Sequence, residues 1–445
     1  MSKVNRRSFL RRSIAAATLA STPGLAFSQV VGAEAPFDDY RALVCIFLHG
    51  GNDSFNMLVP RSNAEYGVYA ASRQNLAIAQ AELLPIDPRT ADGAQYGLHP
   101  AMAGLQALFE AGQLAFVANV GPLIEPTSKD QYLNKSVLLP PQLFSHNDQQ
   151  DQWNSLKGRR SSATGWAGRI ADLIRDRVAG QRMATNASLS GTNLFQTGSE
   201  TFPYVMGPEG PLTFDGFWSP EHRMAFEGIV DADYDSVYER GFAAVQRRAI
   251  DAADTVTVAI DSAPAFSTPF PGSELGTQLH TVARLIAVRD AVAMQRQIFL
   301  VEAGGFDSHD NQNAVQPGLF ADVSESVAAF HAAMAEIGVA DGVTSFTQSD
   351  FGRTLTSNGD GTDHAWGGVQ LVAGGAVRGR DLYGIYPRLE IGGPDDVDGG
   401  RMIPTTSADQ YAASLAKWFG IPDADLGIVA PNLGNFAVHD LGFMG

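Results

Sequence analysis

Four apolar, β-rich runs in this sequence each border a loop rich in Gly, Asp and His, and this pattern strongly limits the possible folds. The runs are residues 41–48, 297–302, 343–348 and 369–373. Continuous apolar runs of this length are typical of strands buried on both faces of a parallel sheet. The bordering loops are the natural place for polar chemistry, because ligands of open α/β sheets bind beyond the carboxyl ends of the strands.

Amphipathic segments separate these runs and predict helices over residues 99–112, 322–337 and 407–419, with a further strand at 114–120. This alternation predicts an α/β fold: a doubly wound, mostly parallel sheet. Residues 186–275 differ, because they are rich in Gly, Pro, Ser, Thr and Phe and have a helical centre near 232–252. We interpret them as an insertion or cap on one domain that spans 29–445.

The first 28 residues have a different character. They contain Lys3, Arg6, Arg7, Arg11 and Arg12 but no acidic residue, then a short apolar stretch at 14–20 and a small-x-small site at 26–28. This order is that of a signal peptide, and Asn-Arg-Arg-Ser-Phe-Leu at 5–10 resembles the twin-arginine export signal. We therefore expect the twin-arginine export machinery to be a partner and the location to be periplasmic or secreted. No apolar run of the mature chain reaches transmembrane length.

Composition excludes several classes of protein. The formal net charge is −17, and removal of residues 1–28, with their five basic residues, leaves −22. Such acidity argues against sequence-independent binding to nucleic acid and against docking on an anionic membrane. The single cysteine, Cys45, excludes an intrachain disulfide framework and a cysteine-based zinc cluster.

The loops at the predicted strand ends supply a set of candidate metal ligands. They are Asp53, Asp307, His309, Asp350, Asp363 and His364. Asp and His from segments far apart in sequence suit a divalent ion such as zinc, manganese or magnesium. A lone Asp after a strand is also a common helix N-cap, which leaves that alternative open for Asp53 and Asp350. We expect His49, His146 and His439 to be ordinary hydrogen-bonded histidines.

Several motifs together resemble the DUF1501 family of exported proteins, which in turn resembles the alkaline phosphatase/sulfatase superfamily. They lie at 48–53, 305–309, 349–354, 363–368, 418–422 and 431–436. The resemblance implies an alkaline-phosphatase-like sheet with Asp307, His309 and His364 at one metal site and Asp53 and Asp350 at a second. It also implies metal-dependent hydrolysis of a phosphate or sulfate ester, on a small molecule or a polymer.

Two features depart from the superfamily pattern. Asp350 is followed by Phe351 where an Asp-His pair is expected, and no clear nucleophile motif is present. Ser145 is our candidate nucleophile, and Ser161, Ser162 and Thr164 are its rivals. Arg353 is our candidate for stabilising transition-state charge, with a structural salt bridge as the alternative.

Two other classes of function remain as alternatives. His49-Gly50-Gly51 resembles the oxyanion loop of an α/β-hydrolase, but the sequence has no Gly-x-Ser-x-Gly elbow, so we rank this class low. The departures at Phe351 and at the nucleophile favour a non-catalytic binding or assembly protein on a phosphatase-like scaffold.

Overall fold

The described part of the chain comprises residues 35–445, apart from 91–92, 159–160, 213 and 215, in a computed structural model. The predicted signal peptide, residues 1–28, lies outside the described residues. Among the described helices, none combines the length and apolar character needed to cross a membrane.

The main sheet confirms the predicted α/β class. Its path of strands is β11-β5-β10-β9-β1-β8-β6-β7, and β12 also pairs with β5. The strands are β1 Arg41–Leu48, β5 Leu114–Gly121, β6 Asn186–Ser188, β7 Tyr204–Val205, β8 Arg296–Ala303, β9 Val343–Ser349, β10 Gly368–Gly374, β11 Asp381–Tyr383 and β12 Thr406–Ser407. All pairs are parallel except those of β10, which is antiparallel to β5 and β9. A small second sheet contains β2 Leu58–Pro60, β3 Leu84–Ile86 and β4 Tyr96–Leu98.

Strand β1 shows why its sequence is apolar at every position. Ala42, Val44, Ile46 and Leu48 belong to one core cluster, and Leu43, Cys45 and Phe47 belong to another. Because successive side chains point to opposite faces, the strand contributes to a core on each side of the sheet.

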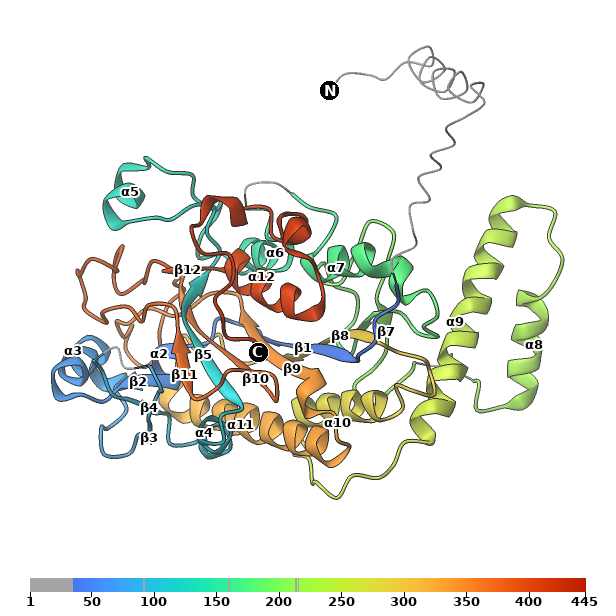
Figure 1. Cartoon of the computed structure of the whole chain (residues 1–445), viewed down its shortest axis with the longest axis horizontal. Coiled ribbons are helices and arrows are strands. Elements are labelled where there is room, and N and C mark those ends of the chain that lie inside the picture. Colours follow the sequence, from blue (N-terminus) through green and yellow to red (C-terminus); the bar gives the residue numbers. More distant parts are fainter. Residues whose placement is uncertain (1–34, 91–92, 159–160, 213, 215) are drawn as a thin grey trace, which may run out of the picture. The chain divides into compact units, whose positions relative to one another are not determined.

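Helices cover both faces, as a doubly wound sheet requires (Figure 1). The first core cluster includes side chains of α4 Ala103–Glu110, α10 Glu274–Ala287 and α11 Gln312–Glu336. The second includes those of α7 Trp166–Ile174, α12 Ala408–Phe419 and α13 Leu426–Val429. Helix α11 begins ten residues before the predicted start at 322, because the helix continues through Pro317.

The segment 186–275, predicted as an insertion or cap, divides between the sheet and a helical hairpin. Its first part forms β6 and β7, which extend the sheet beyond β8. Its helical part consists of α8 Pro220–Val230 and α9 Val237–Asp261. Ser219 and Ser236 accept backbone N–H groups at the starts of these helices, which explains where each begins. The whole segment lies in the same unit, 37–445, as the sheet.

The remaining short helices lie in the connections. They are α2 Ser54–Met57, α3 Asn63–Arg73, α5 Lys129–Asn134 and α6 His146–Ser155. Helix α6 meets the polar edge of the main sheet, because its first residue, His146, lies near the loops that follow β8 and β9.

Candidate metal centre

The register of the three central strands brings the predicted polar loops to one edge of the sheet. Leu48 at the end of β1 is paired with Ala303 of β8 and with Ser349 of β9. Because these strands are parallel and end together, the loops that follow them emerge side by side. Asp307 and His309 lie on the loop after β8, and Asp350 directly follows β9. Asp363 and His364 lie on the loop that leads into β10.

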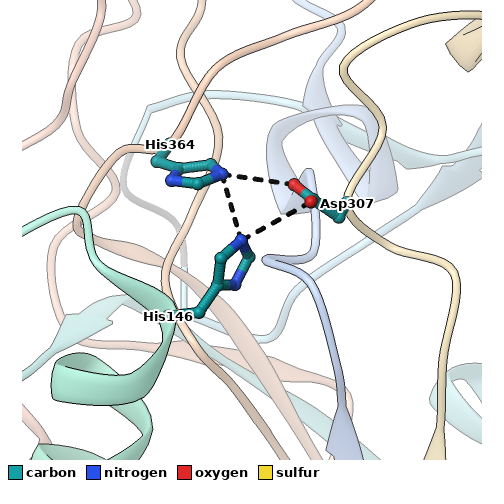
Figure 2. A group of neighbouring side chains, drawn as sticks. All are labelled: His146, Asp307 and His364. Atoms are coloured by element: carbon teal, nitrogen blue, oxygen red, sulfur yellow. Dashed lines mark hydrogen bonds and ion pairs between the residues drawn. The ribbon is translucent and has the colours of Figure 1, made fainter.

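Two side chains from these loops, Asp307 and His364, and one from the start of α6, His146, point their ligand atoms at one another (Figure 2). His146 Nε2 lies 3.1 Å from His364 Nε2 and 3.5 Å from Asp307 Oδ2. His364 Nε2 lies 3.2 Å from Asp307 Oδ1. His309 adds a fourth potential ligand, because its Nε2 lies 2.9 Å from His364 Nε2 and 3.0 Å from Asp307 Oδ1.

The opposite nitrogen of each imidazole is bound to an oxygen. His146 Nδ1 bonds to the Asp350 carboxylate, His309 Nδ1 lies 3.2 Å from Asp363 Oδ1, and His364 Nδ1 lies 2.8 Å from the carbonyl oxygen of Phe144. A carbonyl or an ionised carboxylate can only accept a hydrogen bond, so each Nδ1 carries the proton. Each Nε2 therefore presents a lone pair toward the others, an arrangement that a shared cation stabilises.

The distances between these atoms match those between ligands of one ion. Bonds of 2.0–2.1 Å give ligand separations of about 3.3 Å in a tetrahedron and about 2.9 Å in an octahedron. Among His146, Asp307 and His364, whose ligand atoms all lie within 4.8 Å of one another, the separations given above run from 3.1 Å to 3.5 Å. His309 Nε2 lies 2.9 Å and 3.0 Å from atoms of His364 and Asp307. Three imidazoles and a carboxylate fit zinc or manganese well, and magnesium, which prefers oxygen ligands, less well.

Arg353 fixes the Asp307 carboxylate in place. Its guanidinium is fully buried and donates to Asp307 Oδ1 at 2.7 Å, to the Gly50 carbonyl at 3.1 Å and to Thr362. Burial alone would raise the pKa of Asp307, but Arg353, His309 and His146 together lower it below its usual value. Asp307 is therefore held in the ionised form that binds cations.

The pKa of His364 also favours ligation. Burial lowers this pKa, and nearby His146 and Arg353 lower it further, against the raising effect of the hydrogen bond to the Phe144 carbonyl. His364 thus stays neutral at pH values where an exposed histidine begins to take up a proton. A neutral imidazole is the form that coordinates a metal.

The ligand side chains remain open to solvent, unlike the groups that hold them. Asp307 and His309 are 45% and 44% exposed, whereas the Asp350 and Arg353 side chains are fully buried. The buried groups hold the ligand side chains in place, and the exposed side of the group would leave room for water or a substrate beside a bound ion.

The other predicted residues lie outside the ligand group. Asp350 and Asp363 hold the imidazoles of His146 and His309 and do not themselves meet the converging atoms. Asp53 is bound to Arg73 and Gln312. Ser145 donates its hydroxyl to Asp148 Oδ2 at 2.7 Å, immediately before His146.

His146 is the residue that sequence reasoning missed. It begins helix α6 and does not follow a strand, so its position relative to the strand ends carries no signal in the sequence. Phe351 stands where the superfamily pattern expects the His of an Asp-His pair. The centroid of its ring lies 4.8 Å from the ring centroid of His146 and 4.5 Å from that of His364. Of the rivals to Ser145, Ser162 is engaged with the carbonyl of Thr164.

The family comparison confirms the predicted resemblance. Residues 229–397 match the model of DUF1501, a family described as "Protein of unknown function". The match includes Asp307, His309, Asp350, Asp363 and His364 and lies downstream of His146. No curated protein sequence matches the chain.

Solved structures with a similar arrangement include sulfatases and a phosphonate hydrolase. The phosphonate monoester hydrolase from Silicibacter pomeroyi has a TM-score of 0.37 and 10% identity, over 85% of this chain and 73% of that chain. The PsFucS1 sulfatase from Pseudoalteromonas sp. has a TM-score of 0.34 and 8% identity, over 86% and 68%. The lipoteichoic acid synthase LtaP from Listeria monocytogenes has a TM-score of 0.35 and 8% identity, over 87% and 73%.

Proposed function

We propose that this chain is a metalloenzyme that binds zinc or manganese through His146, His309, His364 and Asp307 and hydrolyses a phosphate or sulfate ester. One observation carries the proposal: the Nε2 atoms of the three imidazoles converge on Asp307 while each Nδ1 is bound to an oxygen. Hydrogen bonding explains the Nδ1 contacts, whereas the Nε2 contacts call for a cation.

The ion, when bound, would polarise the ester oxygens and lower the pKa of a coordinated water. Arg353 keeps Asp307 ionised and in position, and Asp350, Asp363 and the Phe144 carbonyl hold the imidazole tautomers. Ser145 adjoins His146, and its hydroxyl donates to the Asp148 carboxylate. That carboxylate is positioned to accept the proton if Ser145 acts as the nucleophile.

A second candidate function, assembly with another protein, is favoured by the α8–α9 hairpin. Trp218, Tyr238 and Phe242 on and before these helices are 82%, 86% and 68% exposed. Apolar exposure of this extent commonly marks a surface that contacts a partner.

The decisive experiment measures metal content and activity on one preparation of the mature chain. The protein is assayed for bound divalent ions and screened with aryl phosphate, phosphodiester and sulfate esters, with and without chelator. We expect Asp307→Ala to lose both ion and hydrolysis. Asp310→Ala, an exposed aspartate three residues along the chain, is the matched control and should retain both.

Each possible result favours one function. A protein without bound ion, whose melting temperature does not respond to chelator, contradicts the metal centre. Bound ion without hydrolysis of any ester in the screen favours the assembly candidate.

We also propose export by the twin-arginine pathway, on the basis of residues 5–10. Replacing both Arg6 and Arg7 with Lys in a full-length chain is expected to retain the protein in the cytoplasm. Continued export of that variant would contradict the proposal.

A further inference from the structure

The carboxylate of Asp53, which the resemblance to the superfamily assigns to a second metal site, already has a cation beside it. Its Oδ2 accepts from Arg73, and both side chains are fully buried. Gln312 Nε2 donates to the same oxygen. We infer that Arg73 replaces a second metal ion, so that the chain holds a single divalent ion; this inference rests on the proposed metal centre.

Further hydrogen bonds hold the Arg73 guanidinium in place beside Asp53. Its NH1 donates to the carbonyl oxygens of Thr354 at 2.8 Å and Leu355 at 3.3 Å. These carbonyls belong to the segment that follows β9, so the guanidinium links Asp53 to the loop that carries Asp350. Displacing this buried guanidinium would leave those two carbonyl oxygens without a donor, and it would leave the buried Asp53 carboxylate without its counter-charge.

The other carboxylate assigned to the second site, Asp350, serves the first. Its Oδ2 accepts from His146 Nδ1 and, at 3.2 Å, from the backbone N–H of Gly50. Asp350 therefore orients a ligand of the proposed ion. With Phe351 next to it, this segment brings no imidazole to a second ion.

The charges of the connected network balance with one dication. Arg353 interacts electrostatically with Asp53 and Asp363 as well as with Asp307, which joins the two regions. Four carboxylates against two guanidinium groups leave two negative charges, and the members are Asp53, Asp307, Asp350, Asp363, Arg73 and Arg353. One divalent ion neutralises this excess, whereas two would leave a net positive charge beside the buried side chains of Asp53, Asp350, Arg73 and Arg353.

Two oxygen atoms favour a second metal ion, so the number of bound ions has to be measured. Oδ1 of Asp53 and Oδ1 of Asp350 are buried and have no hydrogen-bond partner among the described residues. A second ion beside either oxygen would coordinate it, and bound water would satisfy it equally well. The number of ions per chain separates these two cases.

The experiment uses the full mature chain, equilibrated with excess zinc and, separately, with excess manganese. Weakly bound ions are then removed, and the remaining metal is counted per chain by mass spectrometry. We expect one ion in the wild type, one in Asp53→Asn, and none in Asp307→Asn, which removes a ligand carboxylate of the proposed centre. The double variant Asp53→Asn/Arg73→Gln removes both charges of the buried pair, which keeps the test available if the single variant fails to fold, and it should also hold one ion.

The outcomes separate the two proposals. Two ions in the wild type, falling to one in Asp53→Asn or in the double variant, would overturn the inference and leave the metal centre intact. No ion in the wild type would overturn the metal centre itself, and the inference with it.

Discussion

Asp53 and Asp307 occupy equivalent places in the sequence pattern but opposite environments in the fold. Each follows a central strand of the sheet through a glycine-containing loop. The Asp53 side chain is fully buried against Arg73, whereas that of Asp307 is 45% exposed and faces three imidazoles. An Asp at a strand end therefore does not define a ligand, because its function depends on which cation the rest of the fold supplies.

The two carboxylates also differ in what their arginines do. Arg73 is the principal cation for Asp53. Arg353 contacts only Oδ1 of Asp307, and the two carboxylate oxygens of Asp307 also lie 3.0–3.5 Å from imidazole nitrogens. The first pair is a structural element of the interior, and the second positions a carboxylate for the proposed ion. Four predictions test this contrast, from the largest expected effect to the smallest.

The largest effect is expected at the buried pair. Arg73→Met leaves the Asp53 carboxylate buried without its charge partner, which should reduce the free energy of unfolding by about 3–5 kcal/mol. Arg388→Met is the matched control, because Arg388 is 63% exposed in its ion pair with Glu390 and should change stability by less than about 0.5 kcal/mol. Urea unfolding in the presence of chelator measures both. Equal losses in the two variants would show that the Asp53 pair has no special structural role.

The next effect concerns His146, the proposed ligand that the sequence pattern did not identify. His146→Ala removes one of the converging nitrogens and is expected to weaken zinc affinity by more than about 100-fold, beyond what losing an outer hydrogen-bond partner costs. His439→Ala, an exposed histidine, is the control and should bind zinc as the wild type does. Titration against a competing chelator measures the affinity. Unchanged affinity in His146→Ala would remove that residue from the centre.

A smaller effect is expected from the carboxylates that hold the imidazoles. Asp350→Asn and Asp363→Asn should each weaken zinc affinity by about 10–100-fold, because an amide orients an imidazole less firmly than a carboxylate does. Asp350 is fully buried and Asp363 is 51% exposed, so solvent screening should make the effect of Asp363→Asn the smaller of the two. The reverse order would show that burial does not determine the strength of these contacts.

The sequence was sufficient for much of the fold because the signals there are local. The run at 41–48 is apolar at every position since β1 contributes to a core on each face, and this pattern alone predicts a central strand. The start of α11 was missed because Pro317 lies within the helix and conceals its first turns. The short strands β6 and β7 were assigned to an insertion, because two or three residues carry no periodicity.

Some residues of the candidate site can be predicted from local sequence, and others are brought together only by the tertiary fold. Asp307, His309 and His364 were identifiable because the ends of parallel strands meet at one edge. The pairing of Asp53 with Arg73 was not, since Arg73 lies at the end of helix α3 and only the folded chain brings the two together. His146 was missed for the same reason, as it comes from the start of α6.

The smallest predicted effect is on the pH dependence of metal binding. Each histidine must be neutral to bind the ion, so affinity falls as the pH decreases. Burial lowers the pKa of His364, and Asp307, whose pKa is also lowered, stays ionised, so neither ligand takes up a proton near neutral pH. We therefore expect zinc affinity to change by less than about tenfold between pH 8 and pH 6.5, and to fall more steeply below that. Competition with a chelator, corrected for protonation of the chelator, measures the profile. A drop of more than tenfold between pH 8 and pH 7 would contradict this prediction, because it would mean that a ligand takes up a proton in that range.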